Sequence, residues 1–285
     1  MGVNIKIPEL EKRGETPITL FSKIYFIART LTDYLRSQHG DFVVNDAVSF
    51  MLKLGSNFLN VAETFFDVVK LRKDSNSAYA LFRVQADYLA TLLLIFEGKS
   101  ENETKFRYLL YLLDGLSQRT PSLNDKPLYN GEITKEDYDA LIKQMESAEK
   151  NAKEVFDFCL DAINKHPYKN VNPFLFDKIV KKRQWRYKEF NDTLKNVEYF
   201  HWMDLYPLID NRPDVASFIS LCSHYVHGNV NSLLSNTEDE VFDPIVNFDT
   251  MLIERYITML KKLYGEEKVN EIIKFYLMRL IINGG

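Results

Sequence analysis

The chain has 285 residues, 46% of them apolar and 27% charged, which is the balance of a globular protein and not of a disordered one. Its formal net charge of −4 gives no overall basic excess that would attract the whole chain to nucleic acid or to an anionic membrane. The longest apolar run, 88–96, is too short to span a bilayer, so no membrane segment is expected.

Apolar residues recur at helical spacing along the first third of the chain. The first stripe runs from Thr19 to Leu35, and a second helix is expected from Asp41 to Leu71. Gly55 interrupts the second helix and marks a close helix contact or a bend. The segment from Ser77 to Phe96 is apolar nearly all round, which predicts a buried central helix. A helix from about Glu101 to Leu116 follows.

A long loop is expected near 118–133, where proline, asparagine and glycine concentrate. The next helix begins at Thr134, with Asp137 three residues later in a capping-box arrangement. Apolar residues then follow a near-heptad spacing over 134–163, and the opposite face carries Lys and Glu. This pattern predicts packing along one side only, against the chain's own domain or against a partner, either another protein or a second copy.

The helical signal weakens between Pro167 and Asn211. A helix restarts at Pro213 and runs to about His227, and two more are expected at Asn247–Tyr264 and Glu266–Ile282. No alternating stretch is long enough to require a sheet. We therefore predict one all-α domain over 1–285, a multi-helix bundle with a buried central helix.

Two charged residues, Arg83 and Asp87, lie four positions apart on the helix that is apolar all round. They share one stripe of that helix, so both are expected to be at least partly buried and to need partners. Arg before Asp is the weaker order for supporting a helix, so we infer partners in other elements. The pair is either a structural salt bridge between helices or part of a site.

The helix that begins at Pro213 carries three polar candidates near its end: Ser223, His224 and His227. The simpler interpretation is that His227 stabilises the end of the helix through the helix dipole. The sharper one is a proton-transfer or ligand-binding couple, in which Arg83 holds an anion and Asp87 orients His227. Ser223 and His224 are then candidate ligand contacts.

The sequence gives little support for a metal or a cofactor. Glu198 and His201 form a single Glu-x-x-His, whereas a carboxylate-bridged di-iron bundle needs that motif twice. We expect no metal and no cofactor, since zinc-site and phosphate-loop patterns are missing as well. The cysteines, Cys159 and Cys222, lie among apolar neighbours and are interpreted as core residues, which suits a reducing, cytoplasmic setting.

Basic residues and aromatics alternate between Lys178 and Lys188, an arrangement that can bind single-stranded nucleic acid. The alternative, which the acidic balance of the chain favours, is a solvated helix face anchored to the core by its tryptophan. The candidate nucleic-acid contacts are Lys181, Lys182, Arg183, Trp185 and Arg186.

Arg83 with Asp87, and Ser223 with His227 and Gly228, form an Arg-x-x-x-Asp motif and a Ser-x-x-x-His-Gly motif. In these motifs the chain resembles a bacterial all-helical family of unknown function, which implies an all-helical fold and a bacterial, intracellular setting. The fold style is also similar to that of HEPN domains, which often act in bacterial defence. HEPN ribonucleases carry Arg followed four to six residues later by His, and this sequence has no such pair.

Two functional hypotheses follow. The first is a helical interaction or sensing module, in bacterial stress or phage defence, in which the polar cluster is structural. The second is a small-ligand-binding protein or enzyme built on Arg83, Asp87 and His227. Nucleic-acid binding through 178–188 is a weaker third.

Overall fold

The computed structural model describes residues 16–40, 42–124, 126–226 and 242–283, except for the side chains of 119–124 and 277–283. All elements within these ranges are helices, and their only β pairing is an isolated bridge between Tyr187 and Tyr199. The predicted all-α class is therefore confirmed.

The chain divides into two compact units: unit 1 (Met1–Glu97 and Trp202–Gly285) and unit 2 (Gly98–His201). Unit 1 contains α1 (Pro17–His39), α2 (Ala47–Asp67), the π-helical turn η1 (Val68–Arg72), α3 (Ser75–Phe96), α8 (Trp202–Leu205), the 3-10 turn η2 (Tyr206–Leu208), α9 (Pro213–Val226), α11 (Phe242–Tyr264) and α12 (Glu266–Asn283). Unit 2 contains α4 (Glu101–Asn124), α5 (Lys135–Asn164), α6 (Tyr168–Val171) and α7 (Pro173–Lys182).

Short polar side chains fix where the first helices begin. Thr16, Asp46 and Asp74 precede α1, α2 and α3, and each side chain accepts a hydrogen bond from a backbone N–H of the first turn. These caps satisfy donors that a helix cannot pair within itself. Pro17 at the first position of α1 supplies a backbone angle already suited to a helix.

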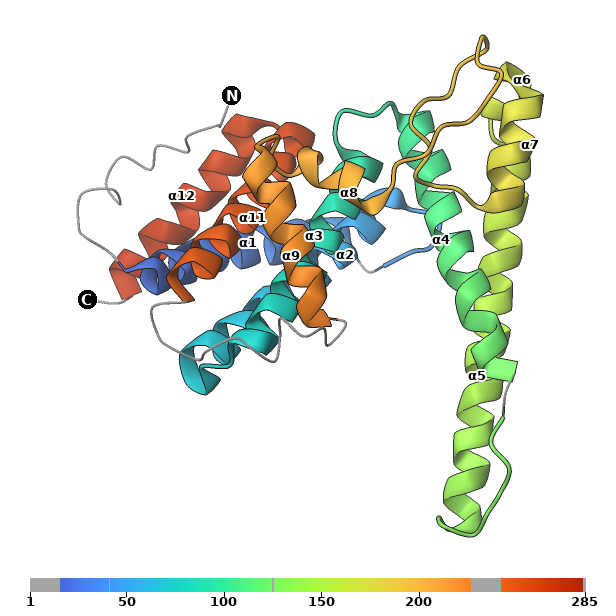
Figure 1. Cartoon of the computed structure of the whole chain (residues 1–285), viewed down its shortest axis with the longest axis horizontal. Helices are drawn as coiled ribbons and strands as arrows, with labels where there is room; N and C mark the ends of the chain where they lie inside the picture. Colours follow the sequence, from blue (N-terminus) through green and yellow to red (C-terminus); the bar gives the residue numbers. More distant parts are fainter. Residues whose placement is uncertain (1–15, 41, 125, 227–241, 284–285) are drawn as a thin grey trace. The chain divides into compact units, whose positions relative to one another are not determined.

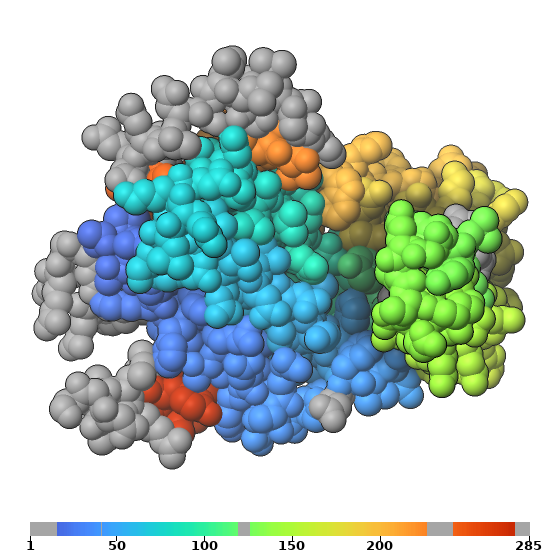
Figure 2. Space-filling view, turned by 90° about the horizontal axis from the view of Figure 1, so that it is seen from below, coloured from blue at the N-terminus to red at the C-terminus, as the bar shows by residue number. Residues whose placement is uncertain are grey.

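Helix α3 is the central helix of unit 1, as the sequence predicts. It packs against α2, α9 and α11, and thirteen of its twenty-two residues are buried (Figure 1). By length and composition α3 is the one described helix that could cross a membrane, but most of the qualifying stretch is buried in the bundle. Figure 2 shows α1 in dark blue, α2 in mid blue and the beginning of α3 in cyan side by side on one face of unit 1.

Gly55 marks a close helix contact, one of the two alternatives that the sequence left open. A Cβ atom at this position would overlap with the hydroxyl of Tyr256 on α11. That hydroxyl lies 3.0 Å from the hydroxyl of Thr32 on α1, inside the bundle. The lack of a side chain at Gly55 thus lets α1, α2 and α11 meet around one buried tyrosine.

In unit 2, α4 and α5 run side by side as a long hairpin (Figure 1). Helix α4 extends to Asn124, beyond the predicted end near Leu116, so the loop expected near 118–133 is shorter than its sequence indicates. The predicted cap of α5 is confirmed, since the Thr134 hydroxyl accepts a hydrogen bond of 3.1 Å from the backbone N–H of Asp137.

Helix α7 lies in the region where the helical signal of the sequence weakens.

A buried arginine on α4 holds the segment that follows α7. Arg107 donates hydrogen bonds to the backbone carbonyls of Trp185, at 3.0 Å, and Tyr187, at 2.7 Å. Its guanidinium also lies 3.8 Å from the centre of the Tyr187 ring. The fully buried Arg107 is therefore a structural clamp whose charge is balanced by Glu103.

Candidate functional site

Arg83 and Asp87 meet Ser223 inside unit 1, although the two segments are far apart in the sequence. Nε of Arg83 donates a hydrogen bond of 2.8 Å to the Ser223 hydroxyl on α9. Another nitrogen of the guanidinium forms an ion pair with Oδ1 of Asp87, one helical turn further along α3. Ser223 is therefore the partner in another element that we inferred for Arg83 and Asp87 from the sequence.

The sequence did not single out the fourth member of this cluster, Tyr206 on η2. Its hydroxyl donates a hydrogen bond of 3.2 Å to Oδ1 of Asp87. The Arg83 guanidinium lies 5.0 Å from the centre of the Tyr206 ring, which is cation–π distance. Arg83, Asp87, Tyr206 and Ser223, here called the α3 polar cluster, therefore connect α3, η2 and α9.

The cluster is neither sealed nor widely open. The Arg83 side chain is 13% exposed and that of Asp87 is 33% exposed, while Tyr206 is buried. Burial raises the pKa of the Asp87 carboxyl, against the opposing influence of the Arg83 guanidinium and the Tyr206 hydroxyl. Burial also raises the pKa of Tyr206, so its hydroxyl stays protonated and acts as a donor.

The predicted couple of Asp87 with His227 lies outside the described residues, as does Gly228. Among the other candidates, Ser223 belongs to the cluster and His224 lies beside it in sequence, half-buried in the last turn of α9. The described residues therefore include Arg83, Asp87 and Ser223 of the predicted site but not His227, its predicted proton-transfer residue.

The chemistry available to the described cluster is limited. The Arg83 guanidinium is engaged by Ser223, Asp87 and Tyr206, so an incoming anion would have to displace one of them. The nearest thiol, Cys222, is buried, and burial raises its pKa to about 12, so it is protonated and unreactive at neutral pH. The cluster thus links three elements, and the Asp87 carboxylate is partly exposed to solvent.

The two aromatic residues of the predicted nucleic-acid segment between Lys178 and Lys188, Trp185 and Tyr187, are buried. Trp185 is 5% exposed and packs edge-on against Tyr111 with ring centres 5.0 Å apart, so it cannot stack on a base. Lys181 and Lys182 are exposed at the end of α7. Arg183 and Arg186 are half-buried and lie over the rings of Phe156 and Trp185 respectively.

Within the described ranges no group of three or more His, Cys, Asp or Glu side chains could hold a metal ion. The Glu198 carboxylate of the single Glu-x-x-His pairs instead with Lys188, at 3.3 Å. Both cysteines are buried and free, and the prediction that they are core residues is confirmed.

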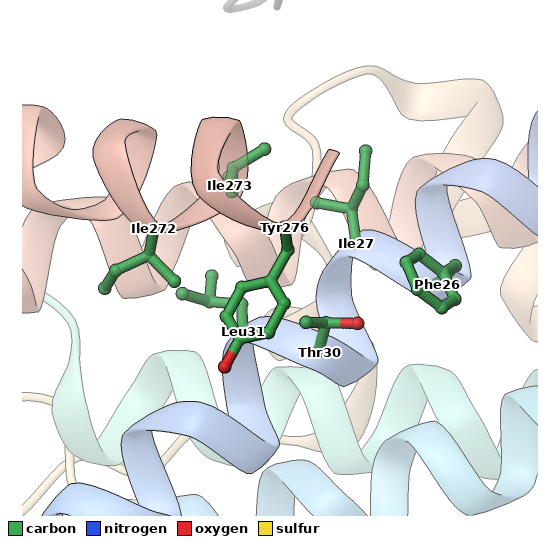
Figure 3. Close-up of a pocket in the computed structure, with 7 residues that line it drawn as sticks. All are labelled: Phe26, Ile27, Thr30, Leu31, Ile272, Ile273 and Tyr276. Atoms are coloured by element: carbon green, nitrogen blue, oxygen red, sulfur yellow. The ribbon is translucent and has the colours of Figure 1, made fainter. Parts of the chain in front are cut away.

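One small cavity lies between α1 and α12 (Figure 3). Its volume of about 10 Å³ leaves room for a single water molecule at most, and its walls are almost entirely apolar. It is therefore a packing gap and not a ligand site. The residues that line it are Phe26, Ile27, Thr30, Leu31, Ile272, Ile273 and Tyr276.

A more open hollow in unit 1 is lined by residues that include Arg212, Asp243 and Met251. The Arg212 side chain pairs with Asp210, since its Nε donates a hydrogen bond to each carboxylate oxygen of Asp210 at 3.1 Å. No residue of the α3 polar cluster lines this hollow.

No family model, no curated protein and no solved structure matches the chain.

Proposed function

We propose that the protein is a helical interaction module and that it binds a protein partner through the tip of the α4–α5 hairpin. One observation carries this proposal: three large apolar side chains are exposed in the segment that joins the two helices, and a fourth is exposed in the second turn of α5. These residues, here called the hairpin tip, are Leu128, Tyr129, Ile133 and Leu141, and Leu128 is 91% exposed.

Contacts between the loop and the first turn of α5 hold the hairpin tip. The Tyr138 hydroxyl donates a hydrogen bond of 2.9 Å to the carbonyl of Pro127, and the Tyr129 ring lies edge-on to the Tyr138 ring at 5.2 Å. Lys135 lies over both rings, at 5.1 Å from Tyr129 and 4.6 Å from Tyr138. A fixed backbone presents the apolar side chains in one arrangement, which lowers the entropic cost of binding.

Single exposed apolar residues are common on protein surfaces, but a group of them at one place indicates an interaction site. An aromatic with aliphatic neighbours is also the composition of the residues that dominate binding energy in interfaces. The remainder of α5 is covered largely by charged side chains and buries only Ala152, Cys159 and Ile163. Within α5 the exposed large apolar residues are Leu141 near its start and Phe158 and Leu160 near its end, so the apolar group at the hairpin tip comes mainly from the segment that precedes the helix.

The contacts of the α3 polar cluster in unit 1 fit the structural role that this proposal gives it. Its hydrogen bonds connect three elements of the chain to one another, as a structural role requires, and Tyr206 is buried within it. The proposed setting is cytoplasmic and bacterial, in a stress or phage response.

Size-exclusion chromatography of cell extract tests the proposal. The native protein is expected to elute above the 33.4 kDa of the single chain, and Leu128→Ser with Leu141→Ser is expected to move it towards that mass. The matched control is Phe158→Ser with Leu160→Ser, which changes two exposed apolar residues of α5 outside the tip. The same elution for all three proteins would refute the proposal.

The second candidate function is a small-ligand site at the α3 polar cluster. It is favoured by Asp87, whose side chain is one-third exposed although Arg83 on the same helix and Tyr206 on η2 both hold its carboxylate. A ligand with a cationic or hydrogen-bond-donating group would bind the open side of this carboxylate.

The test of this candidate is a thermal-shift screen with Asp87→Asn as the comparison. A ligand of the cluster raises the melting temperature of the native protein and not that of the variant. A set of polyamines and amino acids that shifts neither protein, or shifts both equally, counts against a ligand site.

A further inference from the structure

The second half of unit 2 is basic, although the chain as a whole is acidic. Between Lys165 and Lys195 there are nine Lys and Arg residues and only three Asp and Glu residues. The acidic ones are Asp177, Glu189 and Asp192. Such a segment attracts an anionic partner by electrostatics alone.

An exposed aromatic ring lies within this basic region. Phe174, in the first turn of α7, is 58% exposed, whereas its neighbours Leu175 and Phe176 are buried in unit 2. Lys178 lies one turn further on the same side, with its ammonium 4.2 Å from the centre of the Phe174 ring. Lys181 continues this stripe and Lys182 lies next to it. Phe174, Lys178, Lys181 and Lys182 are here called the α7 basic face.

The backbone beneath Phe174 is held firmly. The Asn172 side chain caps α7 by accepting a hydrogen bond of 3.0 Å from the N–H of Leu175. Its amide also donates to the carbonyls of Asn191, at 3.0 Å, and Leu194, at 2.9 Å. The ring is therefore exposed on a rigid support, and little freedom is lost when another flat group stacks on it.

We propose that the α7 basic face binds single-stranded nucleic acid, with a base stacked on Phe174 and the three lysines contacting phosphates. Stacking is available to every base and needs an exposed ring, and Phe174 supplies what the buried Trp185 cannot. The lysines follow Phe174 over the next two turns of α7 and so extend the contact along a strand. This proposal is independent of the hairpin tip.

The composition of the face favours a nucleic acid over a membrane. Binding to an anionic bilayer through a helix needs a broad apolar face that enters the lipid. The apolar face of α7 is buried in unit 2 through Leu175, Phe176 and Ile179, which leaves Phe174 as the exposed ring of the helix. A duplex is disfavoured because its bases are already stacked on one another and leave no face for the ring.

Fluorescence anisotropy with a labelled twenty-nucleotide oligouridine tests the proposal on the full chain. Phe174→Ala is expected to weaken binding by roughly 5- to 100-fold, while Phe174→Trp, which retains a stacking ring, keeps it. The control is Phe158→Ala, which removes an exposed phenylalanine of α5 in the same unit. Equal effects of Phe174→Ala and Phe158→Ala would overturn the proposal.

The salt dependence tests the lysines separately. With three phosphate contacts, raising the salt from about 50 to 200 mM is expected to weaken binding by roughly 10- to 20-fold. Replacing Lys178, Lys181 and Lys182 together by glutamine is expected to remove most of that dependence. The absence of oligouridine binding at about 50 mM salt, or binding only to vesicles that contain phosphatidylserine, would refute the proposal.

Discussion

Ser223 accepts a hydrogen bond of 2.8 Å from Nε of Arg83, which lies 140 positions earlier in the chain. This contact joins the central helix α3 to α9 and orients the guanidinium towards Asp87 and the Tyr206 ring. The two short polar motifs of the sequence therefore meet in one cluster whose described members bind one another.

Loss of the Ser223 hydroxyl tests the structural role of this contact. Ser223→Ala leaves a mostly buried charged donor without its partner, and we expect the free energy of unfolding to fall by about 1–3 kcal/mol. Ser217→Ala, at an exposed position of the same helix, is the control and is expected to change it by less than about 0.5 kcal/mol. Urea unfolding measures both, and equal values would contradict the role assigned to Ser223.

The packing of Gly55 against Tyr256 predicts a second change. A methyl group in Gly55→Ala would displace the Tyr256 hydroxyl from Thr32, and we expect a loss of about 1–3 kcal/mol in unfolding free energy. Tyr256→Phe in the same chain should restore part of it. Gly115→Ala, a helical position with open space around it, is expected to be neutral or stabilising. Equal changes in the stability of the two alanine variants, measured by thermal unfolding, would show that the close contact at Gly55 does not affect stability.

Asp249 gives the protein a specific pH dependence. Its carboxylate is fully buried in α11 without a hydrogen-bond partner among the described residues, and burial raises its pKa well above the ordinary value of 3.8. The folded state therefore retains a proton that the unfolded state loses above about pH 4, so this group lowers stability as pH rises. Through this group the free energy of unfolding falls by at most about 1.4 kcal/mol per pH unit.

Asp249→Asn removes that titration, and the stability of the variant is expected to decline less between pH 4 and neutrality. Glu271→Gln, an exposed carboxylate of α12, is the control and should leave the decline unchanged. Melting temperatures over this range decide the matter, and a steeper decline in Asp249→Asn would show that the proton assignment is wrong.

His166 is expected to lower the stability of the protein as the pH falls, which is the opposite dependence to that of Asp249. Its Nε2–H donates to the carbonyl of Asn102 at 3.0 Å, and its Nδ1 accepts a hydrogen bond of 3.2 Å from the N–H of Tyr168, so the ring is neutral. Burial lowers its pKa below the ordinary 6.5, and the nearby Lys105 adds to this effect. Its contribution to stability is present above pH 6.5 and is lost as the pH falls below it.

We expect His166→Gln to flatten the loss of stability of the native protein between pH 7 and 5. His201→Gln, at an exposed position, should not. Hydrogen exchange of α6 and the adjoining end of α5 reports this for unit 2 directly. Identical pH profiles in the native protein and His166→Gln would exclude the assigned role.

Much of the fold could be predicted from apolar spacing and caps, since α1, α3, α5 and α9 begin within two residues of the expected positions. The end of α4 could not, because Gly115 and Pro121 indicate a break that packing against α5 overrides. Helix α7 was missed because its ten residues begin with a proline and combine exposed charges with only three buried apolar residues.

The candidate site was predictable in part. Arg83 and Asp87 stood out as charges on an apolar helix, and that pattern led to Ser223 through the motif on α9. Tyr206 carries no such signal, because a tyrosine beside a proline in an irregular segment resembles many surface residues. The exposure of Phe174 depends on which side of a ten-residue helix is buried, which composition does not reveal.

Photo-crosslinking in living cells shows whether the hairpin tip binds a protein. A photoreactive amino acid placed at Leu128 is expected to give one crosslinked species of discrete mass. The same group at Lys150, an exposed position on α5 outside the tip, is expected to give none. Adducts at neither position, or the same adduct at both, would show that the hairpin tip is not a protein-binding site.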